Sequence, residues 1–150
     1  MQEFHPPRIR RVRDLTILDD DLVVATDSIG GIGPKPADTV NADAATVARF
    51  ALRVPRLEVI CAGATPVLVI DDLCVELEPT GRQMIAEIRR LAGAAGLPPD
   101  AVTGSAEDNV ETRATGVGVT VLGRLDPTAV SRPGGGRPGD LVMCAGLPIS

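Results

Sequence analysis

Aromatic side chains are almost absent from this chain, which has two phenylalanines and no tryptophan or tyrosine among its 150 residues. Proteins that bind single-stranded nucleic acid stack the bases on aromatic rings, and sites for quaternary ammonium groups surround the cation with such rings. This chain lacks the rings that either kind of site needs. Because 44% of its residues are nevertheless hydrophobic, we expect a packed domain with an aliphatic core.

Positive charge is scarce: 15 Lys and Arg residues stand against 20 Asp and Glu residues, and the formal net charge is −5. This sign disfavours a general nucleic-acid-binding protein. The exception is a group of four arginines near the N-terminus, at positions 8, 10, 11 and 13. We interpret residues 1–13 as a solvated arm, with contact to phosphate groups as the alternative.

The chain has one histidine, three cysteines and no hydrophobic stretch that approaches the roughly 20 residues needed to span a bilayer. His5 lies in the predicted arm, so Ser-His-Asp or Cys-His chemistry within the core is excluded unless the arm folds back. The cysteines at positions 61, 74 and 144 lack CxxC spacing, which disfavours a disulfide framework and a structural zinc site. We therefore expect a cytoplasmic protein with reduced thiols and no membrane partner.

The hydrophobic pattern predicts an α+β fold. Helical spacing predicts one helix over residues 44–52, a second over residues 57–62 after Pro55, and a third that opens at residues 79–81 and ends at residues 93–96. Strands are predicted at residues 15–18, 22–26, 67–77, 101–103, 116–125 and 141–145, and loops at residues 28–36 and 131–139. The elements lack the regular alternation of a doubly wound fold, so we expect a mixed sheet with helices packed on one face.

Gly30, Gly31, Gly33 and Lys35 form a candidate anion-binding loop. Glycine lets backbone amides approach a phosphate group, and the lysine adds positive charge. The segment does not match a P-loop, because Lys35 lies between two prolines, nor a dinucleotide-binding motif, because Pro36 stands where the third glycine belongs. From these residues alone, the segment is either a flexible lid or an ordinary surface loop.

Acidic residues form two further candidate sites. Asp19, Asp20 and Asp21 lie between two predicted strands and form either a hairpin turn or a metal site. A separate set of aspartates lies at predicted strand ends, at positions 14, 27, 71, 72 and 108. Carboxylates that converge at one end of a sheet can hold Mg²⁺. The alternative is that aspartate is simply common beside turns.

Three groups of segments occur in a specific order: residues 14–16 with 25–28 and 31–35, then residues 57–66, then residues 103–109. This order resembles the aminoimidazole ribonucleotide synthetase (AIR synthase) superfamily, which includes thiamine monophosphate kinase, selenophosphate synthetase and the hydrogenase-maturation dehydratase. The resemblance covers residues 14–125. It implies a mixed sheet with helices on one face, a homodimer that joins its sheets into a barrel, and ATP bound near the interface. Residues 14–150 would form this ATP-binding domain after the arm, without the usual second domain.

The resemblance also implies roles for individual residues. Mg²⁺ would be held by four acids: Asp14, Asp27, Glu58 and Asp108. Glu58 stands where most relatives have aspartate. Catalytic roles are implied for Asp27, Lys35 and Asp108, with Lys35 closing over the phosphates. Contacts to ATP are implied for six residues: Gly31, Gly33, Lys35, Asp71, Gly104 and Asn109.

Residues 75–81 and 104–109 are most similar to the branch of the superfamily associated with α-ribazole kinase, which phosphorylates a riboside in cobamide (cobalamin) salvage. The resemblance implies Mg²⁺- and ATP-dependent phosphoryl transfer to a small hydroxyl-bearing substrate. Such catalysis depends on positioning and charge neutralisation, so it needs no histidine base. Two alternatives stay open. One is a non-catalytic dimeric nucleotide-binding or regulatory module, and the other is a different ATP-dependent enzyme of the superfamily, similar to thiamine monophosphate kinase.

Overall fold

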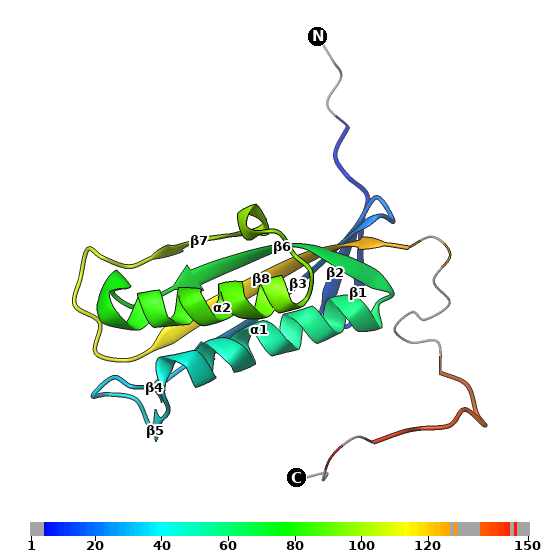
Figure 1. The fold of residues 1–150 in the computed structure, drawn as a ribbon. Coiled ribbons are helices and arrows are strands. Elements are labelled where there is room, and N and C mark those ends of the chain that lie inside the picture. Colours follow the sequence, from blue (N-terminus) through cyan, green and yellow to red (C-terminus); the bar gives the residue numbers. More distant parts are fainter. Residues whose placement is uncertain (1–4, 127, 129–135, 145, 147–150) are drawn as a thin grey trace.

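Two α-helices of the described chain cover one face of a mixed β-sheet, so the predicted α+β fold class is confirmed (Figure 1). The structure is a computed structural model that describes residues 5–126, 128, 136–144 and 146. The strands of the sheet are β1 (Ile9–Val12), β2 (Leu15–Leu18), β3 (Leu22–Gly30), β6 (Ala64–Leu73), β7 (Val102–Ala106) and β8 (Gly116–Leu125). The helices are α1 (Ala44–Cys61) and α2 (Arg82–Ala94), with a π-helical turn, η1 (Leu77–Gly81), before α2 and a 3₁₀ turn, η2 (Pro99–Ala101), after it.

The strand order in the sheet is β1-β2-β3-β8-β6-β7. Neighbouring strands are antiparallel except β6 and β7, which are parallel and are connected through α2. A small separate pair consists of β4 (Ile32–Gly33) and β5 (Val40–Asn41), which lie beyond the end of β3. The central position of β8 confirms the prediction for residues 116–125.

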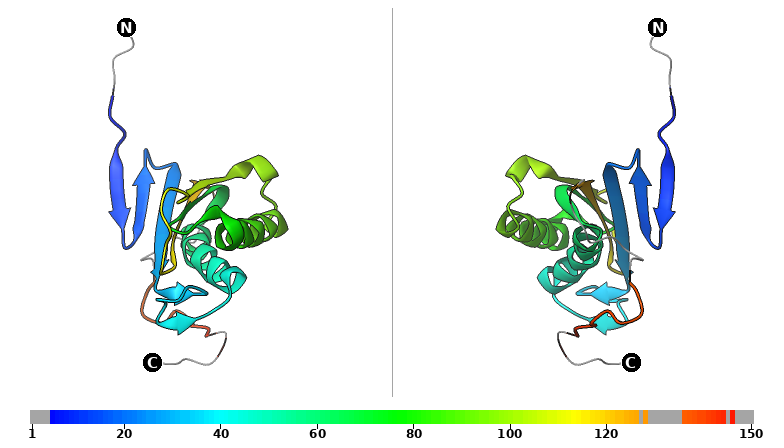
Figure 2. Two further views of the ribbon diagram at one scale, coloured as in Figure 1. Left: turned by 90° about the vertical axis from the view of Figure 1, so that its left-hand side faces the viewer. Right: turned by 90° about the vertical axis from the view of Figure 1, so that its right-hand side faces the viewer.

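The core lies between the helices and the sheet, and it follows from the alternation of side chains along the strands. In β8, Val117, Val119 and Val121 point toward the helices and are at most 3% exposed. On the helix side, Leu52 of α1 and Met84 of α2 are at most 1% exposed. Burying one such side chain stabilises the fold by about 1.5–3 kcal/mol relative to leaving it exposed. No helix of the described chain covers the opposite face of the sheet (Figure 2).

α1 is one continuous helix, whereas the sequence predicted two helices separated at Pro55. Asp43 caps the helix, because its side chain accepts hydrogen bonds from the backbone N and the Oγ1 of Thr46, both at 2.8 Å. Pro55 cannot donate the backbone hydrogen bond that a helix interior expects. Its ring is buried on the core face of α1. We infer that this apolar packing offsets the lost hydrogen bond, so the helix continues to Cys61.

Residues 9–12, which the sequence analysis assigned to a solvated arm, form the edge strand β1. They pair with β2 in antiparallel register, with Ile9 opposite Leu18 and Val12 opposite Leu15. The arm interpretation is therefore wrong for this segment. The alternation of a strand places Ile9 and Arg11 on one face and Arg10 and Val12 on the other. Each face thus carries one apolar and one charged side chain, which removes the pattern that identifies a strand.

The predicted last strand, residues 141–145, is wrong for residues 141–144, which form no strand. The side chains of Leu141, Val142 and Met143 are 94–97% exposed. Their β propensity is ineffective because a strand is stabilised by pairing and packing against neighbours, which this segment lacks within the described part of the chain. Ala145 and residues 131–135 of the predicted loop lie outside the described residues. No helix that the structure describes is long and apolar enough to cross a membrane.

Candidate functional site

Three segments that are distant in sequence meet at one end of the sheet, around Lys35. The segment after β3 carries Lys35, the connection from β6 to η1 carries Glu76, and the β7–β8 loop carries Thr112. The Lys35 ammonium group forms an ion pair with the Glu76 carboxylate, which also accepts a 3.3 Å hydrogen bond from Thr112 Oγ1. The side chains of Lys35 and Glu76 are only 14% and 25% exposed. We refer to residues 31–38, 76–77 and 108–115 as the loop cluster.

Glu76 is a site residue that the sequence analysis did not single out. Burial acts to raise its pKa, but hydrogen bonds from Lys35 and Thr80 outweigh this effect and lower the pKa to about 2. The Glu76 carboxylate is therefore ionised beside the Lys35 ammonium at neutral pH. Its signal in the sequence was its place in residues 75–81, the segment that resembles the α-ribazole kinase branch. As a residue type alone, it is one acid among many.

Asp38 ties the glycine-rich segment to the β7–β8 loop. Its carboxylate accepts hydrogen bonds from the N and the Oγ1 of Thr115, both at 2.7 Å, and from the Lys35 N at 2.8 Å. Burial acts to raise the pKa of Asp38, yet these hydrogen bonds hold it below its usual value. Gly33 packs against this pair, and a Cβ at position 33 would lie 2.2 Å from Thr115 Oγ1. The close approach therefore requires glycine at this position.

Asp108 lies in the same loop cluster as Lys35. Its carboxylate accepts a 2.8 Å hydrogen bond from the backbone N of Leu77, the residue after Glu76. The residue before Asp108 donates its backbone N–H to the carbonyl of Val75 at 3.0 Å. These bonds fasten the β7–β8 loop to the connection that carries Glu76. The structure thus brings together Lys35 and Asp108, two of the three predicted catalytic residues.

A second group of predicted acids lies beside α1. Glu58 and Asp14 line a pocket of about 250 Å³ together with Arg13, Leu15, Leu57 and Cys61. The Oε2 atom of Glu58 is buried, and no residue that the structure describes donates a hydrogen bond to it. Burial raises the pKa of Glu58, and the negative charges of Asp14 and Asp27 raise it further. We refer to Glu58, Asp14 and Asp27 as the Glu58 group.

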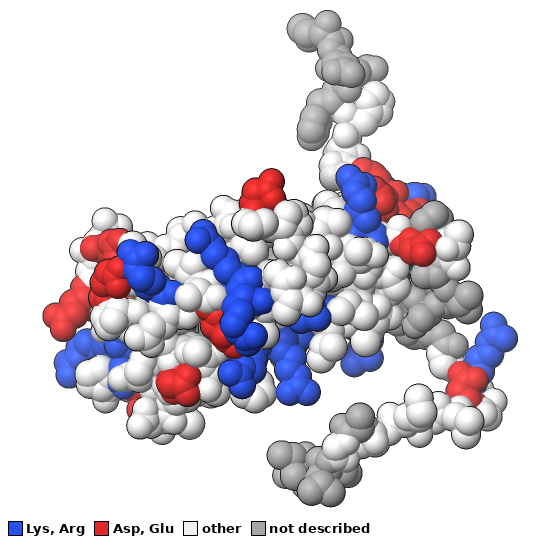
Figure 3. All heavy atoms as spheres, in the orientation of Figure 1, with Lys and Arg blue, Asp and Glu red and all other residues white. Residues whose placement is uncertain are grey.

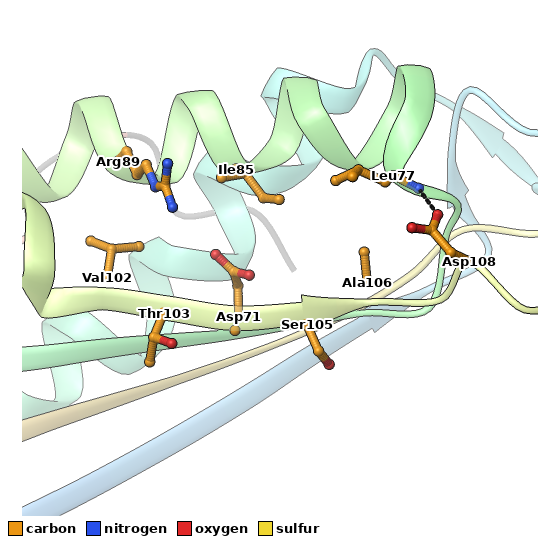
Figure 4. Close-up of a pocket in the computed structure, with 10 residues that line it drawn as sticks. Asp71, Leu77, Ile85, Arg89, Val102, Thr103, Ser105, Ala106 and Asp108 are labelled. Carbon is orange, nitrogen blue, oxygen red and sulfur yellow. Dashed lines mark hydrogen bonds between the residues drawn. The ribbon is translucent and has the colours of Figure 1, made fainter.

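Asp71, a predicted ATP contact, lies in a cavity of about 220 Å³ between α2 and strands β6 and β7 (Figure 4). Its side chain is 3% exposed. Burial raises its pKa to about 6, and the charge of Asp72 adds to this effect while the charge of Arg89 opposes it. Gly104 lies opposite Asp71 in β7, and a Cβ at position 104 would be 2.2 Å from Asp71 Oδ1. Asp108 lies at one end of the same cavity.

The acidic triplet Asp19–Asp21 is the hairpin turn between β2 and β3, as one of the two interpretations predicted. Asp19 and Asp20 adopt positive φ angles of 50° and 57°, which aspartate tolerates better than most residues. Asp20 pairs with Arg8, and Asp21 pairs with Arg124. These exposed ion pairs stabilise the fold by at most about 1 kcal/mol each. Arg8 therefore contacts its own chain here.

The predicted site residues thus occupy three places. The loop cluster contains Lys35, Asp108, Gly31, Gly33 and Asn109; the Glu58 group contains Asp14, Asp27 and Glu58; the third place is the cavity lined by Asp71 and Gly104. Within the described residues, no three His, Cys, Asp or Glu side chains are arranged to hold a metal ion. A full convergence of the strand-end aspartates is therefore not observed in one chain.

The fold is similar to that of several enzymes of known structure. Thiamine monophosphate kinase from Aquifex aeolicus matches with a TM-score of 0.59 and 17% identity, over 77% of this chain and 38% of that chain. AaThiL complexed with AMPPCP and TMP matches with a TM-score of 0.53 and 14% identity, over 79% of this chain and 35% of that chain. Phosphoribosylformylglycinamidine synthase II from Thermotoga maritima matches with a TM-score of 0.51 and 16% identity, over 79% of this chain and 20% of that chain.

These similarities show the fold alone, and this is the AIR synthase-like fold that the sequence resemblance implied. No family model matches the sequence, and no curated protein matches it. The chain spans less than two fifths of the length of the kinases that it matches.

Proposed function

We propose that this chain binds Mg²⁺ and ATP and transfers a phosphoryl group to a small hydroxyl-bearing substrate, with the loop cluster as the phosphate site. The observation that carries the proposal is that two adjacent residues, Glu76 and Leu77, bind Lys35 and Asp108, respectively. A lysine ammonium is a common partner of nucleotide phosphates. The phosphates would compete with the Glu76 carboxylate for Lys35. The fold shared with AaThiL, which was solved with AMPPCP and TMP, supports this proposal.

The pocket shared by Glu58 and Asp14 offers carboxylate oxygens of the kind that bind a divalent cation. The Glu58 Oε2 atom is buried without a hydrogen-bond partner among the described residues, and two further carboxylates lie near it. Mg²⁺ is bound by one or two protein carboxylates, with water and phosphate oxygens completing its coordination shell. We therefore propose Glu58 and Asp14, which line one pocket, as candidate magnesium ligands, since no three acids of the described residues are arranged to hold the ion.

For the acceptor we propose α-ribazole, because residues 75–81 and 104–109 are similar to the α-ribazole kinase branch. These two segments contact each other in the structure, since Asp108 accepts a hydrogen bond from Leu77 N. The similarity thus concerns one place in the fold rather than two unrelated surfaces. That place is next to the proposed phosphate site, as a phosphoryl acceptor requires.

Isothermal titration with AMPPCP and Mg²⁺ tests the nucleotide site. We expect saturable binding by the wild type and at least about tenfold weaker binding, a loss of about 1.4 kcal/mol, for Lys35→Ala and for Asp108→Asn. Arg124→Ala is the matched control. Arg124 lies in β8 opposite Leu22, the first residue of β3, whereas the loop cluster follows the last residue of β3. Glu58→Gln should raise the Mg²⁺ concentration needed for binding. Absence of wild-type binding, or binding undiminished in both site variants, would overturn the proposal.

A nucleotide-binding module without chemistry is the second candidate. The observation that favours it is the limited match to the kinases, of which the chain covers 35–38%. ATP turnover measured with α-ribazole, with TMP and without an acceptor separates the candidates. Phosphorylated α-ribazole supports the kinase proposed here, and phosphorylated TMP supports a thiamine monophosphate kinase-like enzyme. AMPPCP binding without any product supports the module.

We also propose a homodimer formed through the face of the sheet opposite the helices. On this face Leu122 of β8 lies between Val24 of β3 and Leu68 of β6, which are its partners in the two registers. All three side chains are only half-buried. A contiguous row of apolar side chains on an uncovered sheet is typical of a protein interface. A second copy placed sheet against sheet would bury this row.

A further inference from the structure

The carboxylate of Asp71 faces the cavity and has no partner within the described chain. The residue is 3% exposed, and within the described chain its side chain makes no hydrogen bond or ion pair. A buried charge is strongly unfavourable unless it is paired and hydrogen-bonded. Within the described chain this carboxylate has no stabilising partner, and its position in the cavity makes it available to a group from outside the chain.

A guanidinium group faces this carboxylate across the cavity. Arg89 extends from α2 toward Asp71, and its charge acts on the carboxylate, yet the two groups form no ion pair (Figure 4). Basic side chains gather over the two helices (Figure 3). Among them, Arg49 and Arg90 are both engaged by Glu87. Arg89 instead presents its charge to the cavity.

Four of the residues that line the cavity have apolar side chains: Leu77, Ile85, Val102 and Ala106. Thr103 and Ser105 point away from the cavity, to the other side of β7 (Figure 4). The carboxylate of Asp108, at one end, is already engaged by Leu77 N. The volume of about 220 Å³ is below the roughly 300–1,000 Å³ of sites for drug-sized ligands. The cavity therefore suits a molecule much smaller than a nucleotide.

We propose that this cavity binds a small zwitterion with an aliphatic body, the chemical class of the aliphatic amino acids. The ammonium group would donate hydrogen bonds to Asp71, the carboxylate would accept them from Arg89, and the aliphatic side chain would pack against Ile85. A ligand with both charges would pair with both protein groups at once. A simple cation would pair with Asp71 alone, and a simple anion would pair with Arg89 alone. The cavity borders the loop cluster at Leu77 and Asp108, but the two charges proposed to bind the zwitterion, Asp71 and Arg89, lie outside that cluster.

Isothermal titration of the full chain at neutral pH tests the proposal with L-leucine, L-isoleucine and L-valine as probes. We expect saturable binding of at least one of them. 3-Methylbutylamine, which is L-leucine without its carboxylate, and 4-methylpentanoate, which is L-leucine without its ammonium group, should bind at least about tenfold more weakly than the amino acids. A cavity that holds only water gives no saturable heat with any amino acid, and that result would overturn the proposal, as would equal binding of the amine.

Two variants and one control assign the binding to this cavity. Asp71→Asn and Arg89→Gln should each weaken amino-acid binding at least about tenfold. Arg90→Gln is the matched control on the next residue of α2, because Arg90 is engaged by Glu87 and does not line the cavity. Undiminished binding by Asp71→Asn, or equal losses in all three variants, contradicts the proposal. Circular dichroism confirms folding, and AMPPCP titrated into the same samples reports separately on the nucleotide site.

Discussion

Asp71 illustrates how one residue can favour a ligand at the expense of stability. Its pKa is about 6 in the folded chain, against 3.8 for an unperturbed aspartate. The folded state therefore binds the proton more tightly, so the stabilising contribution is complete below pH 3.8 and is lost as the pH rises through about 6. Since one pKa unit corresponds to about 1.4 kcal/mol, the loss is at most about 3 kcal/mol.

Replacing this carboxylate with an amide of the same shape removes the titration. We expect Asp71→Asn to be more stable than the wild type at about pH 7.5, with the difference shrinking as the pH falls toward about 4. Urea unfolding of both proteins at several pH values measures the difference. If the free energies of unfolding stay parallel across this range, Asp71 does not carry the raised pKa.

The pKa of Glu76 shifts in the opposite direction from that of Asp71. Its pKa falls from 4.5 to about 2 on folding, so its stabilising contribution is present above pH 4.5 and is lost as the pH falls toward 2. We expect Glu76→Gln to destabilise the chain by about 1–3 kcal/mol at neutral pH and by less near pH 3. Urea unfolding at the two pH values measures this change.

Glu78→Gln is the matched control for this prediction. Glu78 pairs with Arg82, but the two side chains are 59% and 66% exposed, and exposed ion pairs of this kind contribute at most about 1 kcal/mol. A neutral-pH loss for Glu76→Gln no larger than that for Glu78→Gln would show that the Lys35 pair does not stabilise the loop cluster.

At the scale of elements, a glycine sets the distance between α1 and the sheet. A Cβ at Gly123 of β8 would lie 2.3 Å from Val59 Cγ1 on α1, whereas the nearest atom to a Cβ at Gly118, the Cβ of Asp72, is 3.8 Å away. Gly123→Ala must therefore push the helix away or distort the strand. We expect a loss of about 1–3 kcal/mol for Gly123→Ala and almost none for Gly118→Ala. Thermal unfolding of the two variants compares them directly, and equal losses would refute this account of the packing.

Elements in which hydrophobic residues recur at a clear helical or strand spacing could be predicted from the sequence. β8 alternates strictly between buried valines and other residues, and in α2 the buried side chains of Met84, Ile88 and Ala92 recur every fourth residue. The failures have local causes. In β1, the adjacent Arg10 and Arg11 disrupt the alternation of apolar and polar residues by which a strand is predicted. In α1, Pro55 suggests a break, but its buried ring packs against the core and the helix continues. Residues 141–144 have strand propensity but no neighbouring strand among the described residues.

The site was harder to predict than the fold, because a site depends on which loops meet. The sequence resemblance predicted roles for Lys35 and Asp108, and the structure places both in the loop cluster. The sequence alone could not show that Glu76 pairs with Lys35, since the two residues are 41 positions apart. Nor could spacing show that Asp71 points into a cavity beside α2, because the face on which a strand residue lies depends on register.

At the scale of the whole molecule, the sheet has one face packed by α1 and α2 and one face that no helix of the described chain covers. The alternation that buries Val121 at 0% exposure leaves its neighbour Leu122 half-buried on the other face, between Val24 and Leu68. Apolar side chains at the centre of an interface contribute most of its stability, because their contact excludes water. If two sheets join, Leu122 lies at the centre of the shared surface.

A lysine at position 122 therefore distinguishes a dimer through this face from any other assembly. We expect the wild type to have about twice the 15.6 kDa mass of one chain in light scattering after size-exclusion chromatography. Leu122→Lys should shift the mass to that of one chain, since a lysine ammonium buried between two sheets has no partner there. Leu57→Lys is the control, because Leu57 is 47% exposed on α1, on the opposite side of the sheet. A wild-type monomer at high concentration, or a Leu122→Lys dimer of unchanged affinity, would exclude association through this face.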